Sequence, residues 1–249
     1  MIAAAQDYGP GYGPGSPQDF APPGRECEEQ LRQLARAHHE TLLHLAVAAD
    51  FKDDDTGVHI IRIGYLAEAL ALHLGQAPAY AGLLRKTAPM HDVGKIGTPD
   101  HVLRKAGPLS EQEHNIMARH PEVGAEILGR SHLPMFAMAA EIALTHHEKY
   151  DGTGYPQGLR GEEIPLSGRI TSLVDIFDAL TMDRVYRPAF PVADALRMIA
   201  AERGKALDPL VVDTFMAHAD ELDTLRRKIT SECPSFASLI DAPDFRNPQ

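Results

Sequence analysis

The sequence predicts an all-α fold, a helical bundle whose long loops carry function. Apolar residues recur at intervals of three and four along most of the chain, which is the spacing of a buried helix face. No stretch shows the repeated apolar–polar alternation of a half-buried strand. Glycine and proline separate the helical stretches at Gly107-Pro108, Pro134, residues 152–156, Pro188 and Pro191.

The first 25 residues are rich in proline and glycine and contain too few apolar residues to offset the entropy cost of ordering them. We expect a disordered tail there. Residues 26–49 then carry a helical stripe that includes Leu31, Leu34, Leu42 and Leu45. This helix either packs against its own domain or pairs with a second copy as a homodimer, and the sequence leaves both arrangements open.

A second helix is expected to begin near Asp55 or Thr56, either of which can cap its first turn, and to end at Gly75. Further helices are expected over residues 79–91, 110–128, 135–146, 169–182, 192–202 and 209–225. Pro89 should kink or interrupt the first of these. The helical domain is therefore expected to span residues 26–225, with residues 226–249 as a C-terminal extension.

The composition narrows the classes of function. A chain of 249 residues with 44% hydrophobic content can bury a core, and its two cysteines, Cys27 and Cys233, are expected to be free thiols. A net charge of −11 argues against a general surface for duplex nucleic acid. The chain has no apolar run long enough for membrane insertion and no signal-peptide pattern, so we expect a cytoplasmic location. An anionic ligand would need a local reversal of charge, for which metal ions are the strongest candidates.

The candidate metal ligands lie beside helix ends or glycines. They are Asp55, His59, His91, Asp92, His120, His146, His147 and Asp175. Asp55 and His59 are four residues apart, so on one helix they would share a face, although a capping aspartate and a surface histidine would give the same pattern. His91 and Asp92 are adjacent, so both can reach one ion only at a helix end, where Val-Gly-Lys follows. Mixed imidazole and carboxylate ligands suit manganese, iron, zinc or nickel.

Three segments carry a resemblance to a known family. "HDVGKIGTPD" resembles the signature of HD-domain phosphohydrolases, and "HHEKYDGTGYP" with "GLRGEEIPLSGRITSLVDIFDALTMDRVYR" is similar to the HD-GYP branch of cyclic di-GMP phosphodiesterases. The resemblance covers about residues 43–215. It implies a helical bundle of the HD phosphohydrolase type with a long glycine-rich GYP loop.

The same resemblance implies a set of site residues. His59, His91, Asp92 and Asp175 would surround one metal ion, and Asp92 would bridge to a second ion held by His120, His146 and His147. Asp55 stands where some members hold a third ion with a glutamate. The expected cofactors are thus two or three divalent ions, iron or manganese. The remaining histidines match no ligand position and are expected at the surface or in packing contacts: His38, His39, His44, His73, His101, His114, His132 and His218.

Four further residues are candidates for catalysis and substrate binding. Two divalent ions about 3.5–4 Å apart can activate water and clamp a phosphodiester. Lys95 follows Asp92 by three residues, so on a continuing helix it would reach the same site and bind a phosphate oxygen, unless it is only a surface lysine. Arg184 and Arg187 can hold phosphate oxygens or lie on a solvated helix end. Tyr155 can offer a flat face to a guanine base or simply pack its loop.

Three functions follow as alternatives. The first is hydrolysis of cyclic di-GMP to pGpG, continuing to GMP if a third ion is held. The second is hydrolysis of another cyclic dinucleotide or of a nucleotide monoester. The third is a catalytically silent scaffold, which would be expected to have lost ligands. Only 25 residues precede the first helix, so we expect regulation to act through the tail, that helix or the metal supply.

Overall fold

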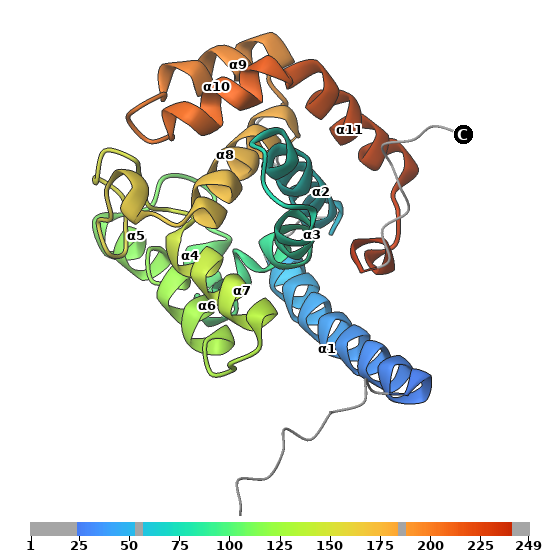
Figure 1. Cartoon of the computed structure of the whole chain (residues 1–249). Helices are drawn as coiled ribbons and strands as arrows, with labels where there is room; N and C mark the ends of the chain where they lie inside the picture. Colours follow the sequence, from blue (N-terminus) through green and yellow to red (C-terminus); the bar gives the residue numbers. More distant parts are fainter. Residues whose placement is uncertain (1–23, 53–56, 184–187, 241–249) are drawn as a thin grey trace, which may run out of the picture. The chain divides into compact units, whose positions relative to one another are not determined.

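The computed structural model describes residues 24–52, 57–183 and 188–240 (Figure 1). Within these ranges the secondary structure is helical and contains no strand, which confirms the all-α prediction. The α-helices are α1 (Arg25–Lys52), α2 (Val58–His73), α3 (Pro78–Thr87), α4 (Asp100–Leu103), α5 (Glu111–Met117), α6 (His120–Leu128), α7 (Pro134–Thr145), α8 (Leu166–Thr181), α9 (Val192–Ala201), α10 (Pro209–Ala217) and α11 (Ala219–Glu232). Short 3-10 helices are η1 (Ala88–Met90), η2 (Val93–Gly97), η3 (Gly161–Glu163) and η4 (Phe236–Leu239).

The chain divides into two compact units, residues 1–36 and 37–249. In the first unit, every described residue is exposed. In the second unit, α1 continues from Ala37 and buries Leu42, Leu43, Ala46 and Ala49. The expected domain boundary at residue 225 falls inside α11, and Leu239 beyond it is buried in the core.

Helix α2 is the central element of the second unit. Twelve of its 16 residues are buried, so it contributes to both core clusters. It packs against α3, α8 and α11 (Figure 1). Its N-cap is Gly57, with a φ of 75°, and Asp55 and Thr56, the expected caps, lie outside the described residues. Gly75 follows the last turn with a φ of 75°, which confirms the expected stop.

Two stretches that were each expected to form one helix form two helices instead. The stretch 110–128 is broken between Met117 and His120, because Pro121 in the first turn of α6 has no N–H to continue a preceding helix. The stretch 209–225 is broken at His218, and α11 then runs on to Glu232. No glycine or proline marks this second break, so tertiary packing overrides helix propensity there: both helices contact α2, and α10 also contacts α8 and α9. The interruption expected at Pro89 is confirmed, since α3 gives way to η1.

Other expectations from composition also hold in the described chain. Cys27 and Cys233 are free and exposed. Among the described helices, none combines the length and the apolar character needed to cross a bilayer.

The short helix η2 lies directly on α6, and Gly94 makes this contact possible. A Cβ atom at Gly94 would lie 1.9 Å from the carbonyl oxygen of His120 and 2.5 Å from the backbone nitrogen of Gly124. Both obstructing atoms are backbone, so no side-chain rotation can relieve the clash. The glycine is therefore required by close approach of two backbones, in addition to the helix stop that the sequence indicates.

We predict that Gly94→Ala lowers the free energy of unfolding by more than about 3 kcal/mol, beyond the usual cost of overpacking. Gly82→Ala is the matched control, because its Cβ would meet nothing closer than 3.9 Å on helix α3. That control should be neutral or slightly stabilising, since alanine favours helix. Urea denaturation of both variants measures the difference, and equal stabilities would contradict the packing argument.

His39 is a packing residue of α1 whose protonation opposes folding. Its Nε2 atom lies 3.2 Å from the carbonyl oxygen of Lys86, and its Nδ1 atom is buried without a hydrogen bond. Burial lowers the pKa of His39 to about 4 from its usual 6.5. Between pH 6.5 and 4, His39 is therefore protonated in the unfolded chain but largely neutral in the folded chain. The free energy of unfolding falls as the pH drops through this window.

We predict that His39→Gln flattens this dependence, because glutamine can still donate to the Lys86 carbonyl but does not titrate. The slope of unfolding free energy against pH should fall by up to about 1.4 kcal/mol per pH unit in this window. His101→Gln, which changes an exposed histidine of α4, should keep the wild-type slope. Urea denaturation across the window tests both variants, and an unchanged slope for His39→Gln would refute the assignment.

Candidate metal centre

Helix ends supply most of the residues of the candidate site. His59 is the second residue of α2, and His120 is the first residue of α6. His146 and His147 directly follow the end of α7. Asp175 is the exception, because it comes from the middle of α8. A helix end can present consecutive side chains to one point, which the regular body of a helix cannot do.

The structure brings seven of the eight predicted metal ligands into two adjacent clusters, in each of which the potential ligand atoms lie within 4.8 Å of one another. One cluster is His59, His91 and Asp175, and the other is Asp92, His120, His146 and His147. The eighth residue, Asp55, lies outside the described residues.

Asp92 lies between the two clusters, as the resemblance implies. Its Oδ2 atom is 3.3 Å from Nε2 of His91, which belongs to the first cluster. Its Oδ1 atom is 3.2 Å from Nε2 of His120 and 3.6 Å from Nε2 of His146, in the second cluster. Asp175 is similarly placed within the first cluster, where its Oδ1 atom is 3.7 Å from His59 and 3.8 Å from His91. Each carboxylate thus faces two imidazoles.

The orientation of the imidazoles leaves bare nitrogens facing one another. Nδ1 of His91 is 3.0 Å from the carbonyl oxygen of Ala88, and Nδ1 of His120 is 2.8 Å from that of Met117. Nδ1 of His146 faces the carbonyl oxygen of Ala143 at 3.0 Å. A carbonyl only accepts, so Nδ1 carries the proton in each ring and Nε2 carries a lone pair.

The bare nitrogens fit a cation. Nε2 of His120 and Nε2 of His146 are 3.3 Å apart, a distance at which two lone pairs repel. Nε2 of His91 and Oδ1 of Asp92 are buried and have no hydrogen bond. Buried polar atoms normally have a partner, and convergent imidazole and carboxylate atoms are the ligands of divalent transition metals. The two clusters therefore have the donor set and the orientation to hold metal ions.

The electrostatics of the site agree with this donor set. Burial favours the neutral form of Asp92, but Lys95 and His91 hold its pKa well below the usual range. Burial also lowers the pKa of His146 and, more strongly, that of His147. Near neutral pH the second cluster thus offers the ionised carboxylate of Asp92 and the neutral imidazoles of His146 and His147, the protonation states that bind a metal. Burial lowers the pKa of His91, but the negative charges of Asp92 and Asp175 raise it by more. The first cluster is therefore a site of negative potential.

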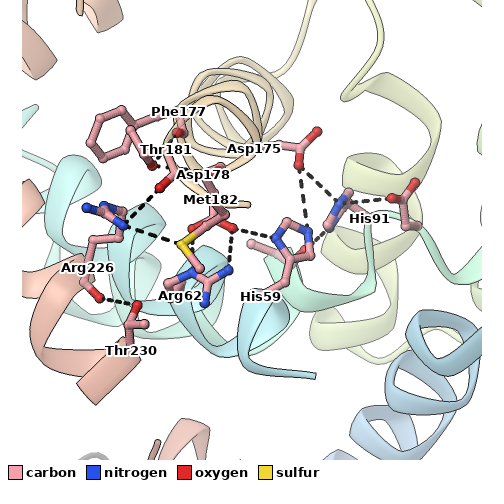
Figure 2. A network of polar contacts seen from close by, with 12 residues as sticks. His59, Arg62, His91, Asp175, Phe177, Asp178, Thr181, Met182, Arg226 and Thr230 are labelled. Atoms are coloured by element: carbon pink, nitrogen blue, oxygen red, sulfur yellow. Dashed lines mark hydrogen bonds and ion pairs between the residues drawn. The ribbon is translucent and has the colours of Figure 1, made fainter. Parts of the chain in front are cut away.

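Asp178 orients His59 from behind, as Figure 2 shows. Its Oδ2 atom accepts a hydrogen bond of 2.8 Å from Nδ1 of His59, which leaves Nε2 to face Asp175. Arg62 donates to both oxygens of Asp178, at 2.5 and 2.8 Å, and all three side chains are buried. Burial favours the neutral acid, but the hydrogen bonds from His59 and Arg62 lower the pKa of Asp178 to about 2. Metal-ligating histidines usually have such a carboxylate partner.

Helix α11 secures the end of α8 beyond this pair. Arg226 on α11 donates to the carbonyl oxygen of Thr181 and to Sδ of Met182, both at 3.4 Å, and its guanidinium lies 5.9 Å from the ring centre of Phe177 (Figure 2). Asp223 on the same helix holds Arg226 at 2.7 Å. Because α8 carries Asp175 and Asp178, this contact supports both residues.

The loop after α7 is anchored beside the second cluster. Glu148 is buried and accepts hydrogen bonds from the backbone nitrogens of Gln157, at 2.7 Å, and Leu159, at 3.0 Å. The ring of Tyr155 stacks on His147, with centroids 5.0 Å apart and an interplanar angle of 25°. Burial raises the pKa of Tyr155 to about 12, so its hydroxyl remains a donor at neutral pH. One face of Tyr155 is thus packed against a candidate ligand.

Lys95 reaches the site, although not through the helix that the sequence suggests. It lies in the 3-10 helix η2, and its Nζ atom is 2.7 Å from Oδ2 of Asp92. Its charge therefore lies at the edge of the second cluster, where an anionic ligand would meet it. Arg184 and Arg187, the other cationic candidates, lie outside the described residues.

Three buried residues that support the site were not predicted from the sequence: Arg62, Glu148 and Asp178. Spacing could have indicated two of them. Arg62 follows His59 by three residues and Asp178 follows Asp175 by three residues, so each lies on the same helix face as a ligand. Glu148 follows the histidine pair directly, and nothing in its spacing indicates the loop contacts that it makes.

A family comparison agrees with this geometry. The family model described as HD domain matches residues 29–211, which is most of the chain. The chain belongs to the HD-domain family. The matched range includes every residue of both clusters.

Similar proteins place this HD domain near the HD-GYP branch, as its motifs suggest. It is 47% identical over 203 residues to a Vibrio cholerae protein named "Cyclic di-GMP phosphodiesterase", covering 76% of this chain and 41% of the relative. It is 40% identical to the Xanthomonas campestris protein "Cyclic di-GMP phosphodiesterase response regulator RpfG", covering 86% and 54%. It is 39% identical to the Vibrio cholerae "3'3'-cGAMP-specific phosphodiesterase 2", covering 79% and 38%.

The chain thus spans roughly half or less of the length of these relatives, between 38% and 54%. Among solved structures, a cyclic GMP-AMP specific phosphodiesterase of V. cholerae, V-cGAP3, matches with a TM-score of 0.55 at 20% identity, over 84% of this chain and 54% of that one. At this identity the match supports the HD-type helical fold alone.

We predict that Asp178→Asn weakens metal binding about 10- to 100-fold, the usual cost of losing a carboxylate behind a ligating histidine. Thermal stability should also fall, because Arg62 keeps a buried charge with a neutral partner. Asp213→Asn is the control, since Asp213 forms only an exposed pair with Arg203. Metal titration followed by spectroscopy and by elemental analysis gives the affinities. An Asp178→Asn protein that is folded and binds metal like the wild type would exclude the orienting role.

Proposed function

We propose that this chain is a metal-dependent phosphodiesterase that hydrolyses cyclic di-GMP to pGpG, and onward to GMP if a third ion is held. The observation that carries the proposal is the position of Asp92, whose two oxygens face separate histidine clusters. A carboxylate shared between two such clusters is the arrangement that a two-metal hydrolytic site requires. The name of the Vibrio cholerae relative at 47% identity supports cyclic di-GMP as the substrate.

The proposed ligands are His59, His91 and Asp175 for one ion and His120, His146 and His147 for the other, with Asp92 shared. When bound, divalent ions there supply Lewis acidity and make water nucleophilic near neutral pH. We propose iron or manganese, because the set combines several imidazoles with carboxylates. Asp55 is the proposed contact to a third ion.

The chain's own residues have separate proposed roles. Asp92 holds the two halves of the centre at a fixed separation. Lys95, whose charge already lies 2.7 Å from that carboxylate, binds a non-bridging phosphate oxygen and so orients the scissile bond. Tyr155 presents an edge or its outer face to a base, while His147 supports its inner face. Arg184 and Arg187 are proposed to bind the second phosphate.

The two alternatives are a different substrate and a catalytically silent scaffold. Hydrolysis of another cyclic dinucleotide is supported by the V. cholerae relative named for 3'3'-cGAMP, which is 39% identical. A nucleotide monoester would use the same metal chemistry in a smaller pocket. A silent scaffold is disfavoured, because the seven candidate ligands in the described chain are all present and fall into two groups that could hold metal ions.

We also propose a cellular location, an oligomeric state and a domain organisation for this chain. We place it in the cytoplasm, acting on a soluble dinucleotide without duplex nucleic acid or membrane insertion. Residues 26–49 are the proposed surface of a homodimer, and Leu31 and Leu34 are more than half exposed there. We propose that the helical domain begins near residue 26 and continues past the expected boundary at residue 225, because α11 crosses that boundary and Leu239 is part of the core.

We predict that the purified protein converts cyclic di-GMP to pGpG or GMP in Mn²⁺ or anaerobic Fe²⁺, and that chelation stops the reaction. Asp92→Ala should reduce turnover to the level of the chelated protein, because it removes the shared ligand. Asp213→Ala, on the surface, should retain full activity. Chromatography of the products measures all three proteins.

Parallel reactions with 3'3'-cGAMP, cyclic di-AMP and a nucleotide monoester separate the alternatives. Faster turnover of one of these would replace cyclic di-GMP as the substrate. If every substrate survives in a protein that binds two or more ions, the phosphodiesterase proposal is wrong and the scaffold reading replaces it.

A further inference from the structure

A second group of potential metal ligands lies at the other end of α2. His73 is the last residue of this helix, His218 lies between α10 and α11, and Glu221 is in the first turn of α11. Their potential ligand atoms all lie within 4.8 Å of one another. His59, in the centre described above, is 14 residues before His73 on the same helix, so the two groups are about 21 Å apart along its axis. The group is thus separate from the HD motif residues.

The two imidazoles converge on one carboxylate oxygen. Nε2 of His73 is 3.3 Å from Oε2 of Glu221, and Nδ1 of His218 is 3.8 Å from the same atom. The two rings stack with centroids 3.7 Å apart and an interplanar angle of 14°. Side chains from three separate parts of the chain therefore place potential ligand atoms close together.

The shorter N–O distance, 3.3 Å between His73 and Glu221, matches the separation of two ligands of one ion, and the longer one, 3.8 Å from His218, must shorten when an ion binds. Both N–O distances exceed the usual 2.7–3.2 Å of an N–H···O bond. An ion with bonds of about 2.0–2.1 Å separates its tetrahedral ligands by about 3.3–3.4 Å. The stacked rings hold their lone pairs in nearly parallel planes, so binding one ion requires the imidazoles to rotate out of the stack about χ2, a torsion with a broad energy minimum.

The surroundings favour a cation. His73 is at the C-terminus of α2, where the helix dipole places partial negative charge. The chain as a whole carries a net charge of −11. Side-chain exposures of 21% for His73, 38% for His218 and 61% for Glu221 leave the group open to solvent, so an ion can enter and keep water in its remaining positions.

We infer that His73, His218 and Glu221 form a second metal site, which takes a borderline divalent ion such as Zn²⁺. Two imidazoles and one carboxylate suit zinc, and two nitrogen ligands disfavour Mg²⁺ and Ca²⁺. The ion clasps the end of α2 to the corner between α10 and α11. Because the site lies outside the HD motifs, this inference does not depend on phosphodiesterase activity.

The clasp would stabilise the contact between the helix that carries His59 and the helix that carries Arg226. Both helices are part of the support of the metal centre, as Figure 2 shows for these two residues. A ligand that binds only the folded state stabilises it in proportion to the logarithm of its concentration. Zinc should therefore raise the thermal midpoint in a manner that depends on these three side chains.

The test is a zinc count by equilibrium dialysis on the full chain. The wild type is expected to bind one more Zn²⁺ per chain than His218→Gln or Glu221→Gln, because the other centre is unchanged in all three proteins. His132→Gln, an exposed histidine outside the group, should bind as many ions as the wild type. Glu221 is exposed, so its variant stays folded even if a histidine variant does not, and circular dichroism verifies this.

A second readout locates the ion. Crystals soaked in zinc should show an anomalous peak between the three side chains in the wild type and none in Glu221→Gln. The inference fails if wild type and Glu221→Gln bind the same number of ions, or if the peak is absent. In that case His73 and Glu221 form only an ion pair, and the thermal midpoint will respond to zinc equally in both proteins.

Discussion

Hydrogen bonds to Nδ1 orient four of the five imidazoles of the candidate metal centre. His91, His120 and His146 donate to carbonyls near their own helix ends, and His59 donates to Asp178. In His91, His120 and His146 these bonds direct Nε2 inward, so the site is organised by atoms that do not themselves act as ligands. The negative field of two carboxylates and the repulsion of facing lone pairs remain, and both are relieved by cations.

The imidazoles can be arranged in this way because several helices end at the site. Pro89 converts α3 into a 3-10 turn, so His91 and Asp92 leave the helix together and can serve neighbouring clusters. Gly94 then lets η2 lie against α6, which brings His120 within 3.2 Å of Asp92. Close contact of the η2 and α6 backbones therefore supports the candidate centre, and the short helices are part of the site.

Much of this could be predicted from the sequence, because helical periodicity indicated an all-α fold and motif order indicated the ligands. Seven candidate ligand residues lie in two groups, and Lys95 reaches Asp92 through a different kind of helix. The break at His218 could not be predicted, since no breaker residue marks it and packing decides it. Glu148 contacts the backbone of the loop that follows it, and Arg62 pairs with Asp178 from another helix. Helical spacing places Arg62 and Asp178 beside candidate ligands, but it does not show that they bind each other.

The stacking of Tyr155 on His147 joins two properties that are usually considered separate. His147 belongs to a candidate ligand set, while Tyr155 belongs to a loop that Glu148, the neighbour of His147, holds in place. A substitution that reshapes this loop to accept a different base therefore also shifts an imidazole. On the proposed roles of Tyr155 and His147, a change in substrate choice would therefore also change metal affinity.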